Sequence, residues 1–160
     1  MKNLEVLRNS ERIALLDMAG LAGIKLSYAV AQNAKTLGEE ALAIQSKLKY
    51  PEEYIKMRDE YREHFKAHAL KDTDGKFVIE EGKYKLDLEK EEEYKKLIES
   101  KNSENQLILE KAQKIEEEYN LFLEEDSNVK LETVKLEDFS ESINPVQMDA
   151  LSFMVDEFKG

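Results

Sequence analysis

The chain of 160 residues contains no cysteine and no tryptophan, only two prolines and only six glycines. The absence of cysteine excludes disulfides, thiolate nucleophiles and cysteine-ligated zinc or iron–sulfur centres. The scarcity of glycine and proline excludes collagen-like and linker-like classes and indicates long helices. A chain of this length can bury a hydrophobic core, and we expect one domain spanning residues 1–160.

Long apolar runs are missing as well. The longest uncharged stretch near the start covers residues 26–34, which is far shorter than the roughly 20 apolar residues of a membrane span. The first 23 residues contain Glu5, Arg8 and Glu11, which a secretory signal peptide would not tolerate. The sequence therefore predicts neither a membrane span nor a secretory signal.

Negative charge is in excess. The chain has 24 Lys and Arg against 35 Asp and Glu, a net charge of −11. Residues 1–50 are slightly positive, and the negative charge lies in residues 51–160. Because phosphate binding requires clustered cations, we expect no direct binding of nucleic acid.

The strongest periodic signal lies between residues 24 and 48. Apolar residues recur there at steps of four and three, at Val30, Ala34, Leu37, Ala41, Ile44 and Leu48. This heptad seam is typical of a helix that packs along another helix. The partner helix can belong to the same chain or to a second copy, and we expect a homo-oligomer.

The remaining elements complete a mostly helical α+β fold. We expect helices over 8–69, with a break or kink at Tyr50 and Pro51, and a β-hairpin over 70–86. A long helix follows over 87–123, which can break near residues 100–105. A strand over 128–136 can extend the hairpin to three strands, and Asn144 and Pro145 begin a terminal helix over 145–158. The antiparallel long helices would form a bundle or a coiled-coil stalk.

A metal site is the first chemical hypothesis. Glu60, His64 and His68 are spaced by four residues and would share one face of a helix. The segment lacks a fourth ligand and the His-Glu-x-x-His order of zinc proteases, so surface histidines explain the pattern better.

A calcium loop and an active site are also poorly supported. Asp72, Asp74, Gly75 and Glu81 match part of a calcium loop, but Leu70 stands where its first ligand belongs. No glycine-rich phosphate loop or nucleophile elbow is present. We expect no enzymatic activity and no cofactor.

Protein binding is the hypothesis that the sequence favours. The seam residues Val30, Leu37, Ile44 and Leu48 are candidate contacts, and Tyr54 and Tyr61 are candidate aromatic anchors. Packing inside the chain is the alternative interpretation of the same residues.

Read in order, several segments resemble a family of small, functionally uncharacterised proteins of tailed phages and prophages of low-GC Gram-positive bacteria. They are KLSYAVAQNAK at 25–35, KDTDGK at 71–76, GKYK at 82–85, VKLEDF at 134–139, and Asn144-Pro145. The resemblance implies a protein of the host cytoplasm or the virion and carries over no catalytic residue.

Three functions remain open at this point. The first is a non-enzymatic phage accessory protein that binds a phage or host protein, in virion assembly or against a host factor. The second is an acidic inhibitor of a host defence enzyme that imitates nucleic acid, although lysines interleave with the glutamates in the long helix. The third is a small metal-dependent enzyme that uses His64 and His68.

Overall fold

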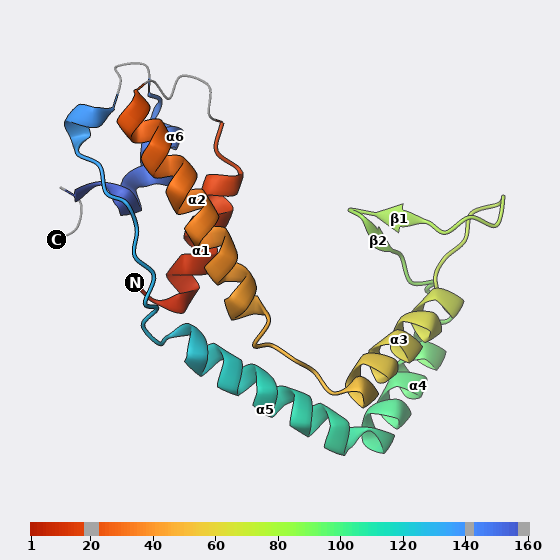
Figure 1. The fold of residues 1–160 in the computed structure, drawn as a ribbon. Coiled ribbons are helices and arrows are strands. Elements are labelled where there is room, and N and C mark those ends of the chain that lie inside the picture. The colour runs from red at the N-terminus through yellow and green to blue at the C-terminus, as the bar shows by residue number, and fades with distance from the viewer. Residues whose placement is uncertain (18–22, 140–142, 157–160) are drawn as a thin grey trace. The chain divides into compact units, whose positions relative to one another are not determined.

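The computed structural model describes residues 1–17, 23–139 and 143–156. The fold is mostly helical, with one small antiparallel sheet. The chain divides into two compact units (Figure 1). Unit 1 contains residues 1–48 and 118–160, and unit 2 contains residues 49–117. The length of the chain by itself predicts one domain spanning residues 1–160.

Unit 1 is built on two adjacent helices, α1 (Asn3–Ala14) and α2 (Ile24–Gln45) (Figure 1). The last residues of α5 (Gln106–Leu123), a 3₁₀ turn at Leu136–Asp138, the helix α6 (Pro145–Leu151) and a 3₁₀ turn at Ser152–Met154 complete it. The core is formed by one apolar face of each element, chiefly Val6, Ile13, Leu26, Val30, Leu37, Ile44, Val134, Leu151, Met154 and Val155. Burial of these side chains is the main stabilising contribution to unit 1.

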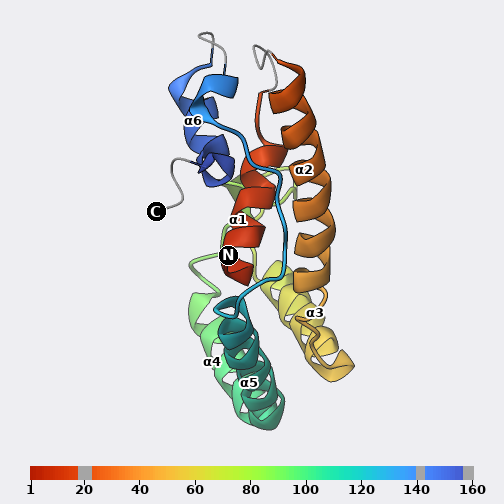
Figure 2. The ribbon, with the colours of Figure 1, turned by 60° about the vertical axis from the view of Figure 1, so that its left-hand side comes forward.

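An extended segment after α5 runs along α2 (Figure 2). It carries the residues 128–136 that we predicted as a strand. That prediction is wrong, because the segment forms only an isolated parallel bridge between Val134 and Val155. Its other main-chain partner is the side chain of Asn33, which hydrogen-bonds Glu132. The side-chain amide of Asn33 thus makes the main-chain hydrogen bonds that a neighbouring strand would make in a sheet.

Unit 2 contains α3 (Glu52–Ala67), the strands β1 (Ile79–Glu80) and β2 (Lys83–Tyr84), α4 (Glu91–Glu104) and the first part of α5. The hairpin was predicted, but among the described residues the sheet has two strands and is not extended to three. The long helix breaks at Asn105, inside the stretch that lacks an apolar anchor. A bundle or coiled-coil arrangement is not confirmed.

Two helix boundaries differ from the predictions. The first helix begins at Asn3 rather than at residue 8, and it ends at Ala14. The terminal helix ends at Leu151 and continues only as a 3₁₀ turn, whereas we predicted a helix to residue 158. Residues 157 and 158 of the predicted terminal helix lie outside the described residues.

The residues that match part of a calcium loop form a turn in the hairpin region, at Asp72 to Lys76. Asp72 Oδ1 accepts hydrogen bonds from the backbone N–H groups of Asp74 and Lys76, both at 2.9 Å. Gly75 has a φ of +78°, a conformation that a residue with a Cβ rarely adopts. The carboxylate of Asp72 therefore closes a turn between Lys71 and Phe77, which form an isolated bridge.

Candidate functional site

The predicted protein-binding residues of α2 lie in the core of unit 1. Val30 and Leu37 are 1% and 0% exposed, and Ile44 is 2% exposed. They pack with residues of α1 and of the C-terminal segment. The heptad seam is therefore occupied within the chain, and these three side chains have no surface to offer a partner. Leu48, at the end of the seam, is partly buried.

The predicted aromatic anchors make contacts inside unit 2. The ring of Tyr54 lies 4.7 Å from that of Tyr50, and Tyr61 donates its hydroxyl to Asn102 Oδ1 at 3.0 Å. Tyr50 donates its hydroxyl to Glu116 Oε1 at 2.7 Å. This hydrogen bond, with burial and the nearby negative charge, raises the pKa of Tyr50 to about 12. The tyrosines thus connect α3 and the residues before it with α4 and α5.

The histidines do not converge with Glu60 on a common point. His68 Nδ1 lies 2.7 Å from the carbonyl oxygen of His64, and its Nε2 lies 3.9 Å from Glu93. Glu60 and His64 line a shallow depression on α3. Among the described residues, no three His, Asp or Glu side chains are grouped as metal ligands would be.

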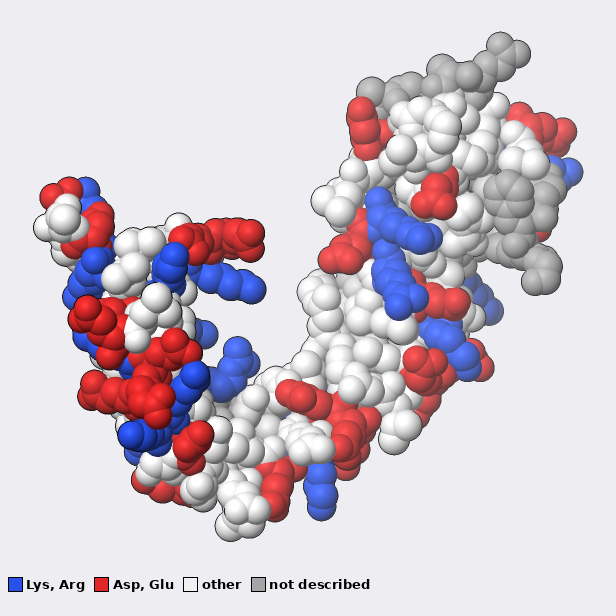
Figure 3. Space-filling model, turned by 180° about the vertical axis from the view of Figure 1, so that it is seen from behind, with Lys and Arg blue, Asp and Glu red and all other residues white. Residues whose placement is uncertain are grey.

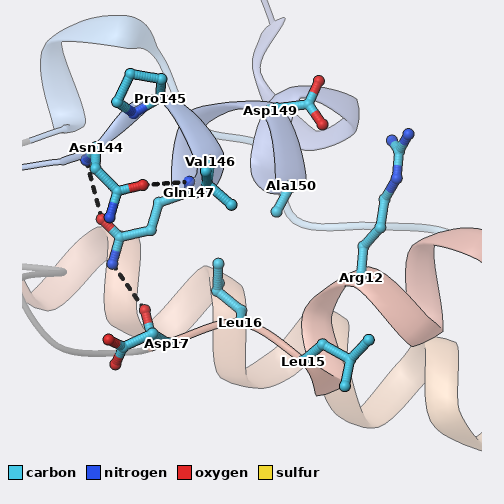
Figure 4. A pocket seen from close by; sticks show the side chains of 10 residues that line it. All are labelled: Arg12, Leu15, Leu16, Asp17, Asn144, Pro145, Val146, Gln147, Asp149 and Ala150. Carbon is cyan, nitrogen blue, oxygen red and sulfur yellow. Dashed lines mark hydrogen bonds between the residues drawn. The ribbon is translucent and has the colours of Figure 1, made fainter.

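The site that the fold does build is a groove in unit 1, between the end of α1 and the start of α6 (Figure 4). Its volume is about 660 Å³, within the usual range of binding pockets. The apolar lining is Leu15, Leu16, Pro145, Val146 and Ala150. Leu15 and Val146 are 84% and 77% exposed. Two large apolar side chains thus stand open to solvent on facing walls.

Hydrogen bonds at the start of α6 fix one wall of the groove and attach it to the other. Asn144 Oδ1 caps α6 by accepting from the Gln147 N–H at 2.9 Å, and Gln147 Oε1 accepts from the Asn144 N–H at 3.0 Å. Gln147 is 3% exposed, and its Nε2 donates to the Asp17 carbonyl at 2.7 Å. This one side chain links the start of α6 to the segment that follows α1 (Figure 4). We predicted the cap and its proline from the sequence, but not the link to Asp17.

Charged side chains stand at the rim of the groove. Arg12 and Asp149 project from its two walls at one end (Figure 4), and neither forms an ion pair within the described part of the chain. Asp17 contributes a second carboxylate to the lining. An apolar floor with a donor and an acceptor beside it can hold an apolar side chain and hydrogen-bond the peptide main chain around it.

One ion pair lies at the start of α2. Lys25 Nζ lies 2.6 Å from Asp138 Oδ2. This hydrogen bond, together with the one from the Lys135 N–H, holds the pKa of Asp138 below its usual value. The Asp138 hydrogen bond also raises the pKa of Lys25. The pair ties the start of α2 to the 3₁₀ turn at Leu136–Asp138.

Charges of both signs alternate on the surface. In the view of Figure 3, Lys and Arg side chains lie between Asp and Glu side chains on both units. Along α4, for example, Lys95 pairs with Glu91 at 2.7 Å. None of the described helices is long and apolar enough to span a membrane.

The groove residues were missed by the sequence analysis. A helix was predicted through residues 15 and 16, and none of the apolar residues that line the groove was a predicted contact. The end of α1 at Ala14 instead places Leu15 in a turn outside the core. The sequence gives one indication of the groove: the apolar Val146 lies two positions after the capping residue Asn144, in the first turn of the helix.

We compared the chain with models of protein families, with curated proteins and with solved structures, and found no match in any of the three.

Proposed function

We propose that the protein is a non-enzymatic binding protein that captures a segment of another protein in the groove between α1 and α6. The observation that carries this proposal is the exposure of Leu15 and Val146 on facing walls of one groove. Exposed apolar side chains gathered in a concave site are typical of interaction surfaces. In the phage setting that the sequence resemblance implies, the partner is a virion protein or a host protein.

The lining of the groove favours a peptide over a charged small molecule as the ligand. The apolar lining can bury one or two apolar side chains, which supply most of the affinity of a peptide anchor. Arg12 and Asp149 are available to the carbonyl and N–H groups of a main chain. Nucleic-acid mimicry requires a ridge of negative charge, and the ion pairs along α4 interrupt any such ridge.

Selection from a random peptide library, with the full chain as bait, tests this function. We expect peptides with an apolar anchor, whose affinity by fluorescence anisotropy falls at least tenfold in Leu15→Glu and in Val146→Glu. Leu121→Glu is the matched control, because Leu121 is 71% exposed in unit 1 but lies outside the groove. Peptides that bind equally to all three variants would show that the groove is not the site.

A further inference from the structure

A second, smaller cavity adjoins the groove in unit 1. This cleft has a volume of about 310 Å³ and lies between α1 and the 3₁₀ turn at Ser152–Met154. Arg12 lines both cavities, so the cleft continues the groove along α1. The other lining residues of the cleft are Met1, Glu5, Arg8, Asn9 and Phe153. The continuous site is therefore apolar at the groove and cationic at the cleft.

Two arginines without an ion-pair partner lie in the cleft. Arg8 and Arg12 are one helical turn apart on α1, and both are exposed. Within the described residues, neither guanidinium forms an ion pair or a hydrogen bond. Among the described residues that line the cleft, Glu5 is the one carboxylate, and it accepts the Lys2 N–H at 2.7 Å. Like charges four residues apart on a helix repel each other, and an anion from outside the chain would offset this repulsion.

A buried amide in the same cleft lacks a strong hydrogen-bond partner. Asn9 is 6% exposed, and its Nδ2 donates to Met1 Sδ at 3.9 Å. A thioether sulfur is a weak acceptor, and the described residues supply no other acceptor to this amide. Buried polar groups in proteins are normally hydrogen-bonded, because an unpaired one costs free energy. A carboxylate oxygen would be a stronger acceptor than the sulfur.

We propose that the cleft binds the carboxylate of an acidic side chain on the protein segment held in the groove. The inference rests on the proposed function, because the same segment places its apolar anchor between Leu15 and Val146. The two guanidiniums donate to the carboxylate, a pairing for which the planar donors of arginine are well suited. Asn9 Nδ2 donates to the same group in place of its contact with sulfur.

The surrounding charge favours a single acidic group over a polyanion. The chain has a net charge of −11, and Asp149 projects from the groove wall that faces Arg12 (Figure 4). A nucleic acid would bring successive phosphates against these carboxylates. One carboxylate placed between Arg8 and Arg12 avoids them, since Asp149 does not line the cleft.

The geometry of α1 sets the spacing between the anchor and the acid. At a helical rise of about 1.5 Å per residue, Arg8 lies about 10 Å from Leu15 along the helix. An extended peptide advances about 3.3 Å per residue. We therefore expect the acidic residue about three positions from the apolar anchor, on the same side of it in every peptide that binds.

Peptides selected from a random library on the full chain test this spacing. We expect Asp or Glu to be enriched about three positions from the anchor. Replacement of that acid by its amide should weaken binding about tenfold in fluorescence anisotropy at low salt, and less at high salt. Acid and amide forms that bind equally would overturn the inference.

A charge variant of the protein tests the contact itself. Arg8→Gln should weaken binding of the acidic peptide about tenfold and change binding of its amide form by less than about twofold. Lys47→Gln is the matched control, because Lys47 is an exposed cation of unit 1 that lines neither cavity. Circular dichroism checks that each variant is folded. Equal losses of both peptide forms in Arg8→Gln would show that Arg8 does not contact the acid.

The two proposals can fail separately. If the selected peptides lose affinity in Leu15→Glu but show no preferred acid, the groove binds a segment and the cleft takes no part. If no anchored peptide is selected, both proposals are wrong.

Discussion

The side chain of Asn33 forms both main-chain hydrogen bonds of Glu132. Its Nδ2 donates to the carbonyl oxygen and its Oδ1 accepts from the N–H, each at 2.8 Å. Asn33 is 1% exposed, so water cannot replace these bonds. The amide attaches the extended segment after α5 to the middle of α2, where a neighbouring strand would otherwise be needed.

Asn33→Ala should therefore destabilise unit 1. The substitution leaves a backbone donor and a backbone acceptor without their partner, at an expected cost of about 2–3 kcal/mol in the free energy of unfolding. Urea denaturation followed by circular dichroism measures this. Gln32→Ala removes a neighbouring but exposed amide and should change the free energy by less than about 0.5 kcal/mol. Equal losses in both variants would contradict a specific role for Asn33.

Gly38→Ala should have the opposite effect on stability. Alanine is favoured over glycine in a helix interior by about 1 kcal/mol, and the added methyl group meets no atom within 4 Å. We expect a higher melting temperature in dilute protein. A lower melting temperature would show an unfavourable contact at this position.

The pair of Lys25 and Asp138 makes stability dependent on pH. The pKa of Asp138 is lowered from 3.8 in the folded state, so its contribution is present at neutral pH and is lost as pH falls below about 4. The pKa of Lys25 is raised from 10.5, so its contribution is lost as pH rises above that value. Asp138→Asn should lower stability at pH 7 and differ little from wild type at pH 2. Glu137→Gln, at the exposed neighbour, should have a smaller effect at pH 7.

Tyr50 should ionise at a higher pH than an ordinary tyrosine. Its pKa of about 12 depends first on the hydrogen bond to Glu116. Ultraviolet titration of the wild-type protein should show a late step that is absent in Tyr50→Phe. In Glu116→Gln, this step should move toward pH 10. Glu117→Gln changes a carboxylate that accepts from Gln113 instead and should leave the step in place.

Local signals account for what could be predicted from the sequence. The asparagine and proline before α6, the turn at Asp72 and Gly75, and the weak stretch that ends at Asn105 depend on a few neighbouring residues. The face of α2 that enters the core was also visible, because its period is strong. What this face contacts was not visible, since both a second helix and a second copy satisfy a heptad.

The missed features depend on residues far apart in the chain. Asn33 and Glu132 are separated by 99 positions, and Gln147 and Asp17 by 130. In the sequence, Asn33 only interrupts the apolar face of α2. Its role becomes visible once the structure shows that it hydrogen-bonds Glu132. The groove was missed for a related reason, because it exists only where α6 returns to the end of α1.

The division of the chain has a consequence for its synthesis on the ribosome. Residues 49–117 of unit 2 are contiguous and are complete before the last part of unit 1 is made. The α2 face with Val30 and Leu37 needs Val134, Leu151 and Met154 to cover it. While unit 2 and these residues are still being translated, that face remains exposed to solvent. The nascent chain therefore passes through a stage in which chaperones can bind the face that later becomes the core.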